Sequence, residues 1–207
     1  MNSATRQKIV MTALELFYVK GFNSTSISDI LSRSQVHSGS LYHFFPGKQD
    51  LLVAVLECYR DGIKEQLLDL AWVGVDDPID KIFALLNGYR TGLVESDFAS
   101  GCPIGNLALE ISEPDPRIRE LLDVNFKNWI AAVEQCLDDA GNRLPAGTDR
   151  HALAEFILTT MEGAIMQART ARDIAVFDRN VAVLRAHMEM LMEKATDRAT
   201  NSAKVQP

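Results

Sequence analysis

The sequence predicts an all-α protein of about nine helices, and three observations support this fold class. Apolar residues recur at helical spacing, as in Ile9, Ala13, Leu16 and Phe17, which share one face of a 3.6-residue period. Glycine or proline marks the ends of several periodic segments, as at Gly21, Pro46 and Gly141. No stretch shows the strict apolar and polar alternation of a half-buried strand.

The first three helices have recognisable ends. The first contains Ile9 to Phe17 and stops at Gly21, the usual position of glycine after a helix. The second covers residues 27–34, where Thr25 or Ser26 can serve as the cap. Ser38 can cap the third, which ends before Pro46. Residues 23–44 are therefore predicted to form a helix, a short turn and a second helix.

Six further helices are predicted in the rest of the chain. They cover residues 48–71, 78–95, 103–111, 117–140, 148–171 and 177–195. Pro78 and Pro103 suit the first turns of two of them. The segments 72–77, 97–101, 113–116 and 142–147 are expected to be linkers, loops or breaks. Residues 196–207 carry few apolar side chains and are expected to form a disordered tail.

The charge of the chain is unevenly distributed. The net charge is -7, yet residues 1–50 carry five basic and three acidic side chains, a net charge of +2. Chance scatter of surface charge is one interpretation, and a DNA-facing head on an acidic body is the other. The second interpretation divides the chain into a helix-turn-helix DNA-binding head at 1–47 and a helical-bundle domain for ligand binding and dimerisation at 48–195.

Composition and spacing argue against several other classes of protein. No apolar run approaches the roughly 18 residues of a membrane span, and the N-terminus lacks the apolar core of a signal peptide, so no membrane partner and a cytoplasmic location are expected. The cysteines Cys58, Cys102 and Cys136 have neither the pattern of a disulfide framework nor zinc-ligand spacing. No metal, cofactor or enzymatic activity is predicted, because no His/Glu, Ser/His/Asp or Gly-rich phosphate motif is present.

Residues 38–44 have the pattern of a DNA-reading helix. Such a helix enters the major groove, about 12 Å wide, with its N-terminal residues toward the bases. Leu41 and Phe44 lie three residues apart and can pack inward, which leaves Tyr42 and His43 free to donate hydrogen bonds. The leading residues are small or polar: Ser38, Gly39 and Ser40.

The first 52 residues resemble a known family. Ala13-Leu14-Glu15-Leu16-Phe17, Gly21-Phe22, Thr25-Ser26-Ile27, Ile30 and the run from Gly39 to Leu52 are similar to the head of the TetR/AcrR repressors, without a gap over about 45 residues. The resemblance implies a nine-helix, two-domain protomer that dimerises and binds a palindromic operator on double-stranded DNA. It also implies that a small molecule in the C-terminal domain releases the DNA.

The resemblance also implies roles for individual residues. Thr25 and Ser26 are similar to phosphate contacts, and Lys48, which begins the next helix, to the phosphate-binding lysine. Tyr42 and His43 are similar to residues that touch the DNA backbone. The groove-entering residues would be His37, Ser38, Gly39 and Ser40. Tyr42 as a packed aromatic, and His43 or Lys48 as plain surface side chains, stay open as alternatives. The turn at residues 31–35 departs from the family's usual Ala-Gly or Gly-Val pair, and the operator sequence is not predicted.

The predicted helices at 148–171 and 177–195 are the expected homodimer surface. Gly163 would permit close approach in the first of them. Their apolar stripes contain Leu153, Phe156, Ile157, Thr160, Met161, Ala164, Val181, Leu184, Met188, Leu191 and Met192. The alternative is that both stripes face only their own bundle.

A ligand pocket inside the bundle should be mostly apolar with a few polar groups. Asn106 and Glu110 are the most informative candidates, because they share a helix face at i, i+4 and polar groups within an apolar body need partners. The candidate set is Phe83, Leu86, Tyr89, Phe98, Cys102, Asn106, Leu109, Glu110, Trp129, Met161, Glu162 and Met166. Each of these side chains could instead belong to the core.

Cys102 lies in the motif Gly-Cys-Pro-Ile-Gly-Asn at residues 101–106. A cysteine at a helix N-terminus gains thiolate character and reactivity. The motif resembles a TetR-like subgroup in which some members sense electrophiles or oxidants through this cysteine. The alternative interpretation is a small buried residue at a tight turn. The expected effector is therefore apolar or electrophilic.

The predicted function is a ligand-responsive repressor that binds its operator as a dimer. The ligand, or modification of Cys102, would favour a conformation that moves the helix at 48–71 and changes the separation of the two heads. A helical adaptor that binds other proteins is the alternative, and it would not account for the positive head.

Overall fold

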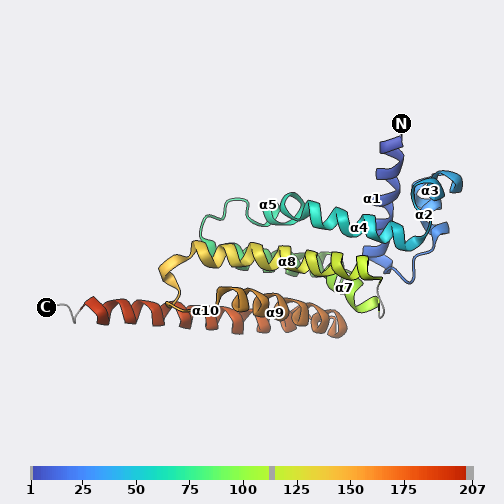
Figure 1. Ribbon diagram of the computed structural model, residues 1–207. Helices are drawn as coiled ribbons and strands as arrows, with labels where there is room; N and C mark the ends of the chain where they lie inside the picture. Colours follow the sequence, from blue (N-terminus) through green and yellow to red (C-terminus); the bar gives the residue numbers. More distant parts are fainter. Residues whose placement is uncertain (1, 112–114, 204–207) are drawn as a thin grey trace. The chain divides into compact units, whose positions relative to one another are not determined.

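The computed structural model describes the backbone of residues 2–111 and 115–203 and the side chains of residues 4–111 and 115–197. All regular structure in these residues is helical and none is β-strand, which confirms the predicted fold class (Figure 1). None of the described helices has both the length and the apolar character that crossing a membrane requires. The chain forms two compact units, one of residues 1–64 and 102–127 and the other of residues 65–101 and 128–207.

The first unit begins with a small cluster of helices. α1 (Asn2–Lys20) contacts α2 (Ile27–Ser34), α3 (Ser38–Phe44) and α4 (Lys48–Ile63). The apolar faces of the four helices meet in a common core, in which the fully buried side chains are Ile9, Ala13, Ile30, Leu41, Leu51, Leu52, Val55 and Leu56. Because α4 completes this core, the first unit does not end at residue 47, where the sequence predicted the domain boundary.

Local hydrogen bonds set the ends of α2. The Ser26 side chain accepts a hydrogen bond from the Asp29 amide at 3.0 Å, and the Asp29 carboxylate accepts one from the Ser26 amide at 2.9 Å. This capping box satisfies two amides that a helix start leaves unpaired. At the other end, Gln35 turns the chain with a left-handed φ of 53°.

The start of α3 differs from the prediction. The residue at the cap position is His37 rather than Ser38, and the His37 side chain makes no capping hydrogen bond. The His37 carbonyl instead accepts hydrogen bonds from the amides of Ser40 and Leu41. The hydroxyl of Ser38 is thus not used as the cap, because Ser38 is already the first helical residue.

The long helix predicted at 48–71 is continuous but not uniform. α4 passes into a π-helical turn, η1 (Lys64–Leu68), and then into the short α5 (Asp69–Ala71). The division between the two compact units falls at the start of this π turn.

Two further helical segments complete the first unit. α7 (Pro103–Glu110) starts after Cys102 and ends one residue before the predicted end. The first part of α8 (Pro116–Asp139) is joined to α4 by Asn125, whose side-chain amide donates to the Leu56 carbonyl at 3.1 Å. Of the break predicted at 113–116, residues 113 and 114 lie outside the described residues.

The second unit is a helical bundle. It contains α6 (Pro78–Glu95), the end of α8, the short 3-10 turn η2 (Gly141–Arg143), α9 (Arg150–Ala171) and α10 (Ile174–Ala203). α9 and α10 lie side by side along their length, and both contact α6 (Figure 1). The core of this unit includes Ile82, Leu85, Leu86, Val133, Leu137, Ala154, Ile157, Met161, Phe177, Leu184 and Met188.

The last two helices differ from their predicted bounds. α9 begins two residues later, because the side chain of Asp149 caps it by accepting from the Ala152 amide. α10 begins at Ile174 and continues to Ala203, so the expectation of a disordered tail from residue 196 is wrong as far as residue 203. No proline or glycine interrupts residues 174–203, so helix propensity is favourable even where apolar residues are few.

Candidate nucleic-acid interface and effector site

α3 presents a polar face to solvent. Leu41 is its buried residue, whereas His37, Ser38, Gly39 and His43 are exposed. Tyr42 is also exposed, at 53%, so it is not the packed aromatic that the sequence left open. A Cβ built on Gly39 meets no atom within 4 Å. The fold itself therefore does not require glycine at this position.

The buried aromatic of this region is Phe45 rather than Phe44. Phe45 is 3% exposed, whereas Phe44 is half-buried and its ring makes a T-shaped contact with that of His43, the centroids 5.0 Å apart. The Phe45 amide also closes the helix by donating to the Leu41 carbonyl. Leu41 and Phe45, at i, i+4, thus fix the orientation of α3.

Thr25 does not offer its side chain to DNA, and the prediction that it contacts phosphate is wrong for this structure. Its exposed fraction is 1%, and its hydroxyl donates to the Gly21 carbonyl at 2.7 Å. It therefore satisfies a carbonyl at the end of α1. Ser26 is exposed at the start of α2, and hydrogen bonds from its amide and hydroxyl lower the pKa of Asp29.

Two of the five cations in the first 50 residues are paired with carboxylates. Lys20 lies 3.7 Å from Asp29, and Arg33 lies 2.5 Å from Glu15. No ion pair involves Arg6, Lys8 or Lys48 in the part of the chain that is described. The positive charge of the head that is not part of an ion pair therefore lies on these three side chains.

Arg6 is a candidate phosphate contact that sequence analysis did not identify. Its guanidinium lies 5.2 Å from the centre of the Phe45 ring, a cation–π contact that places it beside the residue that closes α3. The only feature of the sequence that could have indicated a phosphate contact at this position is its positive charge, early in α1. Its proximity to α3 depends on how the helices pack.

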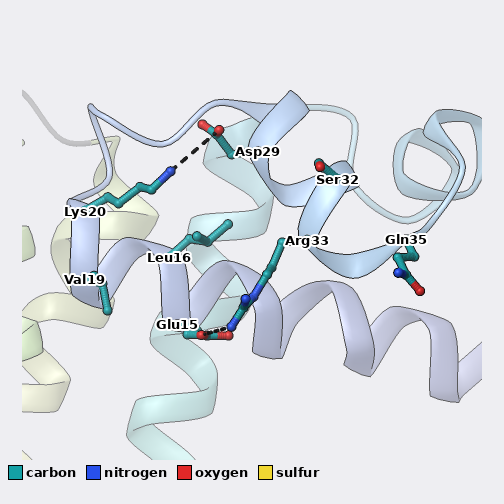
Figure 2. A pocket seen from close by; sticks show the side chains of 8 residues that line it. All are labelled: Glu15, Leu16, Val19, Lys20, Asp29, Ser32, Arg33 and Gln35. Carbon is teal, nitrogen blue, oxygen red and sulfur yellow. Dashed lines mark hydrogen bonds and ion pairs between the residues drawn. The ribbon is translucent and has the colours of Figure 1, made fainter.

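An open groove runs between α1 and α2 (Figure 2). Both ion pairs of the head cross it, as the dashed lines show, and the side chains that line it are Glu15, Leu16, Val19, Lys20, Asp29, Ser32, Arg33 and Gln35. None of the predicted effector residues is among them. Its mixed and internally paired charges are unlike an apolar effector pocket.

Lys48 begins α4 in a half-buried position. Its ammonium lies 4.2 Å from the centre of the Phe22 ring. Partial burial lowers its pKa, and the carboxylate of Glu110 opposes that shift. Lys48 is thus held by an aromatic face and a nearby negative charge rather than extending freely into solvent.

Glu110, predicted as an effector contact, binds the loop after α1. Its carboxylate accepts hydrogen bonds from the amides of Phe22 at 2.7 Å and Asn23 at 2.9 Å. Its backbone carbonyl accepts a third from the Asn23 side chain at 3.0 Å. Both carboxylate oxygens are therefore occupied in the arrangement described. Asn106, four residues earlier on α7, is half-buried.

Cys102 caps α7. It is 5% exposed, and its sulfur accepts a hydrogen bond from the buried Gly105 amide at 3.5 Å. This geometry accounts for a small residue at the turn and also places the sulfur at a helix N-terminus. Cys58, Cys102 and Cys136 form no disulfide. Burial raises the pKa of the Cys136 thiol to about 11, which disfavours the reactive thiolate form of that cysteine.

The predicted effector residues of the second unit are partly core and partly surface. Phe83, Trp129 and Met161 are buried, and Met166 is exposed. Tyr89, Phe98 and Glu162 are half-buried. The indole N–H of Trp129 has no hydrogen-bond acceptor among the described residues, although its side chain is 4% exposed. A buried donor without an acceptor is unusual in a folded protein.

The apolar residues of the two helices predicted to form the dimer surface are likewise partly buried and partly exposed. Leu153, Ile157, Met161, Ala164, Leu184 and Met188 are buried within their own unit, as the alternative interpretation expected for the stripes as a whole. Other large apolar side chains of the two helices remain exposed. They are Phe156 and Met166 on α9, and Val183 and Met190 on α10.

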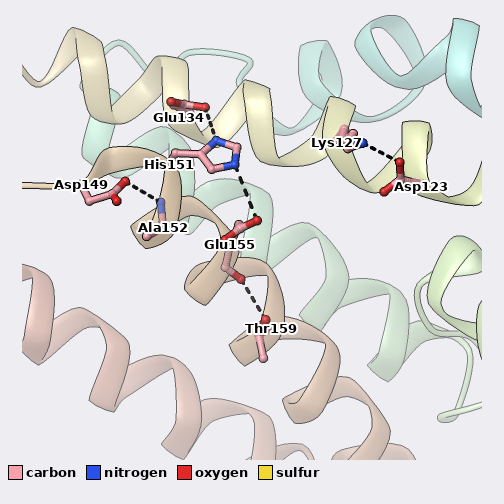
Figure 3. A network of polar contacts seen from close by, with 8 residues as sticks. All are labelled: Asp123, Lys127, Glu134, Asp149, His151, Ala152, Glu155 and Thr159. Carbon is pink, nitrogen blue, oxygen red and sulfur yellow. Dashed lines mark hydrogen bonds and ion pairs between the residues drawn. The ribbon is translucent and has the colours of Figure 1, made fainter.

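A histidine joins α8 and α9 at the surface of the second unit (Figure 3). His151 Nδ1 lies 2.8 Å from the Glu134 carboxylate, and its Nε2 lies 3.6 Å from that of Glu155. The hydrogen bond that the His151 ring donates to Glu134, followed by the charge of that carboxylate, raises the pKa of His151. Among the side chains that are described, no cluster of histidine, cysteine and carboxylate residues has the geometry of a metal site.

Both parts of the chain match families of known transcriptional regulators. Residues 9–55 match the model of the tetR family of bacterial regulatory proteins, and residues 78–199 match that of the LmrA/YxaF-like transcriptional regulator C-terminal domain. The HTH-type transcriptional regulator Rv0196 of Mycobacterium tuberculosis is 32% identical over 177 residues, which cover 84% of this chain and 88% of the relative.

Two solved structures are also similar. The regulatory protein TetR from Rhodobacter sphaeroides superposes with a TM-score of 0.78 at 28% identity, covering 87% of this chain and 97% of that one. The reduced form of NemR from Escherichia coli gives a TM-score of 0.75 at 25% identity, covering 88% and 96%.

Proposed function

The chain belongs to the TetR family of DNA-binding transcriptional regulators, and on that basis we propose that it is a repressor that binds a palindromic operator as a homodimer and leaves it in response to a small molecule. The helix-turn-helix head supplies the DNA contacts. The helical bundle supplies the effector site and the dimer surface.

The observation that carries this proposal is the exposed polar face of α3. Leu41 and Phe45 anchor the helix, while His37, Ser38 and Gly39 are left in solvent at its leading end. Gly39 has no packing reason to be glycine, so close approach by a partner is the remaining reason for it. The proposed contact set is Ser26, His37, Ser38, Gly39, Ser40, Tyr42, His43 and Lys48. We add Arg6 because its guanidinium lies over the Phe45 ring at the end of α3.

A salt titration tests DNA binding. Duplex DNA from the region flanking this gene is titrated with the protein at several salt concentrations. Each phosphate contact contributes about -0.9 to the slope of log affinity against log salt. A Lys48→Gln variant should lower the magnitude of the slope by about that amount. Equal affinity at low and high salt would contradict the proposal.

The effector is proposed to be an apolar molecule that carries a hydrogen-bond acceptor. The Trp129 indole N–H, buried and without an acceptor in the described residues, would donate to it. Trp72 and Trp129 are the two tryptophans of the chain, so in Trp72→Phe the tryptophan fluorescence comes from Trp129 alone. Apolar carbonyl compounds should then change the fluorescence at lower concentrations than their hydrocarbon analogues do.

Modification of Cys102 is proposed as a second route to release. NemR, a transcriptional repressor in Escherichia coli, has been solved in a form described as reduced, which supports oxidation-dependent states in a similar protein. N-ethylmaleimide should release DNA from the protein and should fail to do so from Cys102→Ser. Cys58→Ser is the matched control, since Cys58 is half-buried within α4. If N-ethylmaleimide releases DNA from both variants, the reagent acts at a residue other than Cys102.

In either route, the bound or modified bundle would favour a conformation that moves α4 and so changes the separation of the two heads. Changing the DNA-competent fraction from 99% to 1% requires about 5.5 kcal/mol of differential binding. Two effector molecules per dimer could share that free energy.

A further inference from the structure

Glu110 binds the loop after α1 through hydrogen bonds rather than through apolar packing. Glu110 is the last residue of α7, and it reaches back 88 positions in the sequence to accept from the Phe22 amide. With the Asn23 amide and the Asn23 side chain, three hydrogen bonds join the two segments. Hydrogen bonds to a carboxylate are stronger than those between neutral groups.

The backbone at Gly21 leaves room for the Glu110 carboxylate. Gly21 has a φ of +86°, a conformation that L side chains rarely adopt. A Cβ built on Gly21 would lie 2.6 Å from an oxygen of Glu110. Glycine is thus required at this position both by the backbone and by the approach of Glu110, so the loop and the carboxylate fit each other closely.

The same loop connects Glu110 with the candidate phosphate contact Lys48. Phe22 donates its amide to Glu110 and offers its ring face to the Lys48 ammonium, 4.2 Å from the ring centre. The carboxylate charge also favours the protonated form of Lys48. The ring that Lys48 contacts therefore belongs to a residue that Glu110 holds in place, and the Glu110 charge offsets part of the effect of burial on the Lys48 pKa.

We propose that Glu110 is a positioning residue for DNA binding, which fixes the loop between α1 and α2 and, through Phe22, holds the Lys48 ammonium where it meets a phosphate. This inference rests on the proposed DNA binding. Glu110 itself, as an anion, does not contact the DNA. Its effect on affinity is opposite in sign to that of an ordinary surface carboxylate, whose removal reduces repulsion of the phosphates.

The sign difference defines the experiment. Glu110→Gln keeps the shape of the side chain but leaves one acceptor oxygen where two amides need acceptors. Glu15→Gln is the matched control, since it removes the same charge from an exposed position on α1. Operator affinity is measured for both with the duplex that binds the wild-type chain. We expect about a tenfold loss in Glu110→Gln, the equivalent of one charged hydrogen bond, and no loss in Glu15→Gln.

A double-mutant cycle separates positioning from a general effect on folding. Lys48→Gln should lower the salt slope by about 0.9 in the wild-type background and change it much less in the Glu110→Gln background. Equal changes in both backgrounds would overturn the proposal, as would equal affinities for Glu110→Gln and Glu15→Gln.

Amide exchange of the DNA-free protein tests the contact independently of DNA. In Glu110→Gln, the amides of Phe22 and Asn23 should exchange about tenfold faster, and unchanged rates would overturn the inference. If Glu110→Gln does not fold, Asn23→Ala removes one of the three hydrogen bonds and should show smaller effects of the same sign. If Glu110→Gln shows faster exchange but the wild-type chain binds no duplex, the proposed DNA binding is contradicted while the contact between Glu110 and the loop is still supported.

Discussion

Arg90 on α6 and Asp178 on α10 form a two-point ion pair in which Nε lies 2.7 Å and Nη2 3.0 Å from the two carboxylate oxygens. The carboxylate raises the pKa of Arg90, and the guanidinium lowers that of Asp178. Both side chains are more than one-third exposed, so solvent screens much of this interaction. Its geometry nonetheless fixes the register of two helices of the second unit.

The two-point geometry of this pair should contribute measurably to stability. Arg90→Lys keeps the charge but cannot make two parallel hydrogen bonds, and we expect it to lower the free energy of unfolding by roughly 0.5–1 kcal/mol. Denaturant unfolding measures the change. Arg90→Lys in an Asp178→Asn background should have almost no further effect, and a full additive loss would show that the two side chains do not interact.

Gly21→Ala should be strongly destabilising. The substitution forces a Cβ into a left-handed backbone position and toward the Glu110 carboxylate, at a cost of roughly 1–3 kcal/mol. The thermal midpoint of the variant would report it. A midpoint equal to that of the wild-type chain would mean that the loop adopts a different conformation in solution.

Gly39→Ala should weaken binding to the operator without destabilising the protein, unlike Gly21→Ala. A Cβ at this position meets nothing within 4 Å, and alanine favours a helix over glycine by about 1 kcal/mol. Stability should therefore be unchanged or higher, while affinity for the operator falls because the added methyl group faces the DNA. Undiminished affinity would show that α3 does not approach the DNA at Gly39.

The stabilising effect of His151 should depend on pH. Its pKa in the folded protein is raised above the ordinary value of 6.5 by Glu134. The protonated histidine therefore contributes fully below about pH 6.5, and the contribution disappears as the pH rises through the higher folded-state pKa. The thermal midpoints of wild-type and His151→Gln should differ most in acid and converge in alkali. A gap that widens with pH would contradict this assignment.

The exposed apolar residues of α10 should be needed for dimerisation. Val183 and Met190 are seven residues apart and share a helix face, exposed at 72% and 56%. The double substitution Val183→Glu and Met190→Glu should convert a dimer to a monomer in sedimentation velocity experiments, because it would bury two unpaired charges at the interface. Val73→Glu is the control, because Val73 is exposed at 77% and belongs to the linker before α6 rather than to α9 or α10. A dimer that survives the double substitution would place the interface elsewhere.

Local chemistry was enough to predict the helices and most of their ends. Ser26 and Asp29 form their capping box from neighbouring residues alone, and Pro78 and Pro103 begin helices because their fixed φ suits a first turn. The α3 face was predictable for the same reason, since the alternation of Leu41 with Tyr42 and His43 follows from helical periodicity. Where the prediction was wrong, at the tail from residue 196, periodicity of apolar residues was a poorer guide than the absence of helix-breaking residues.

Tertiary packing decided which polar groups were already occupied. Thr25 looked available for phosphate in the sequence, yet its hydroxyl is used by the carbonyls at the end of α1. Glu110 looked like an effector contact, yet it binds amides 87 and 88 positions away. A sequence lists donors and acceptors, but their partners depend on distances that arise only when distant segments pack together.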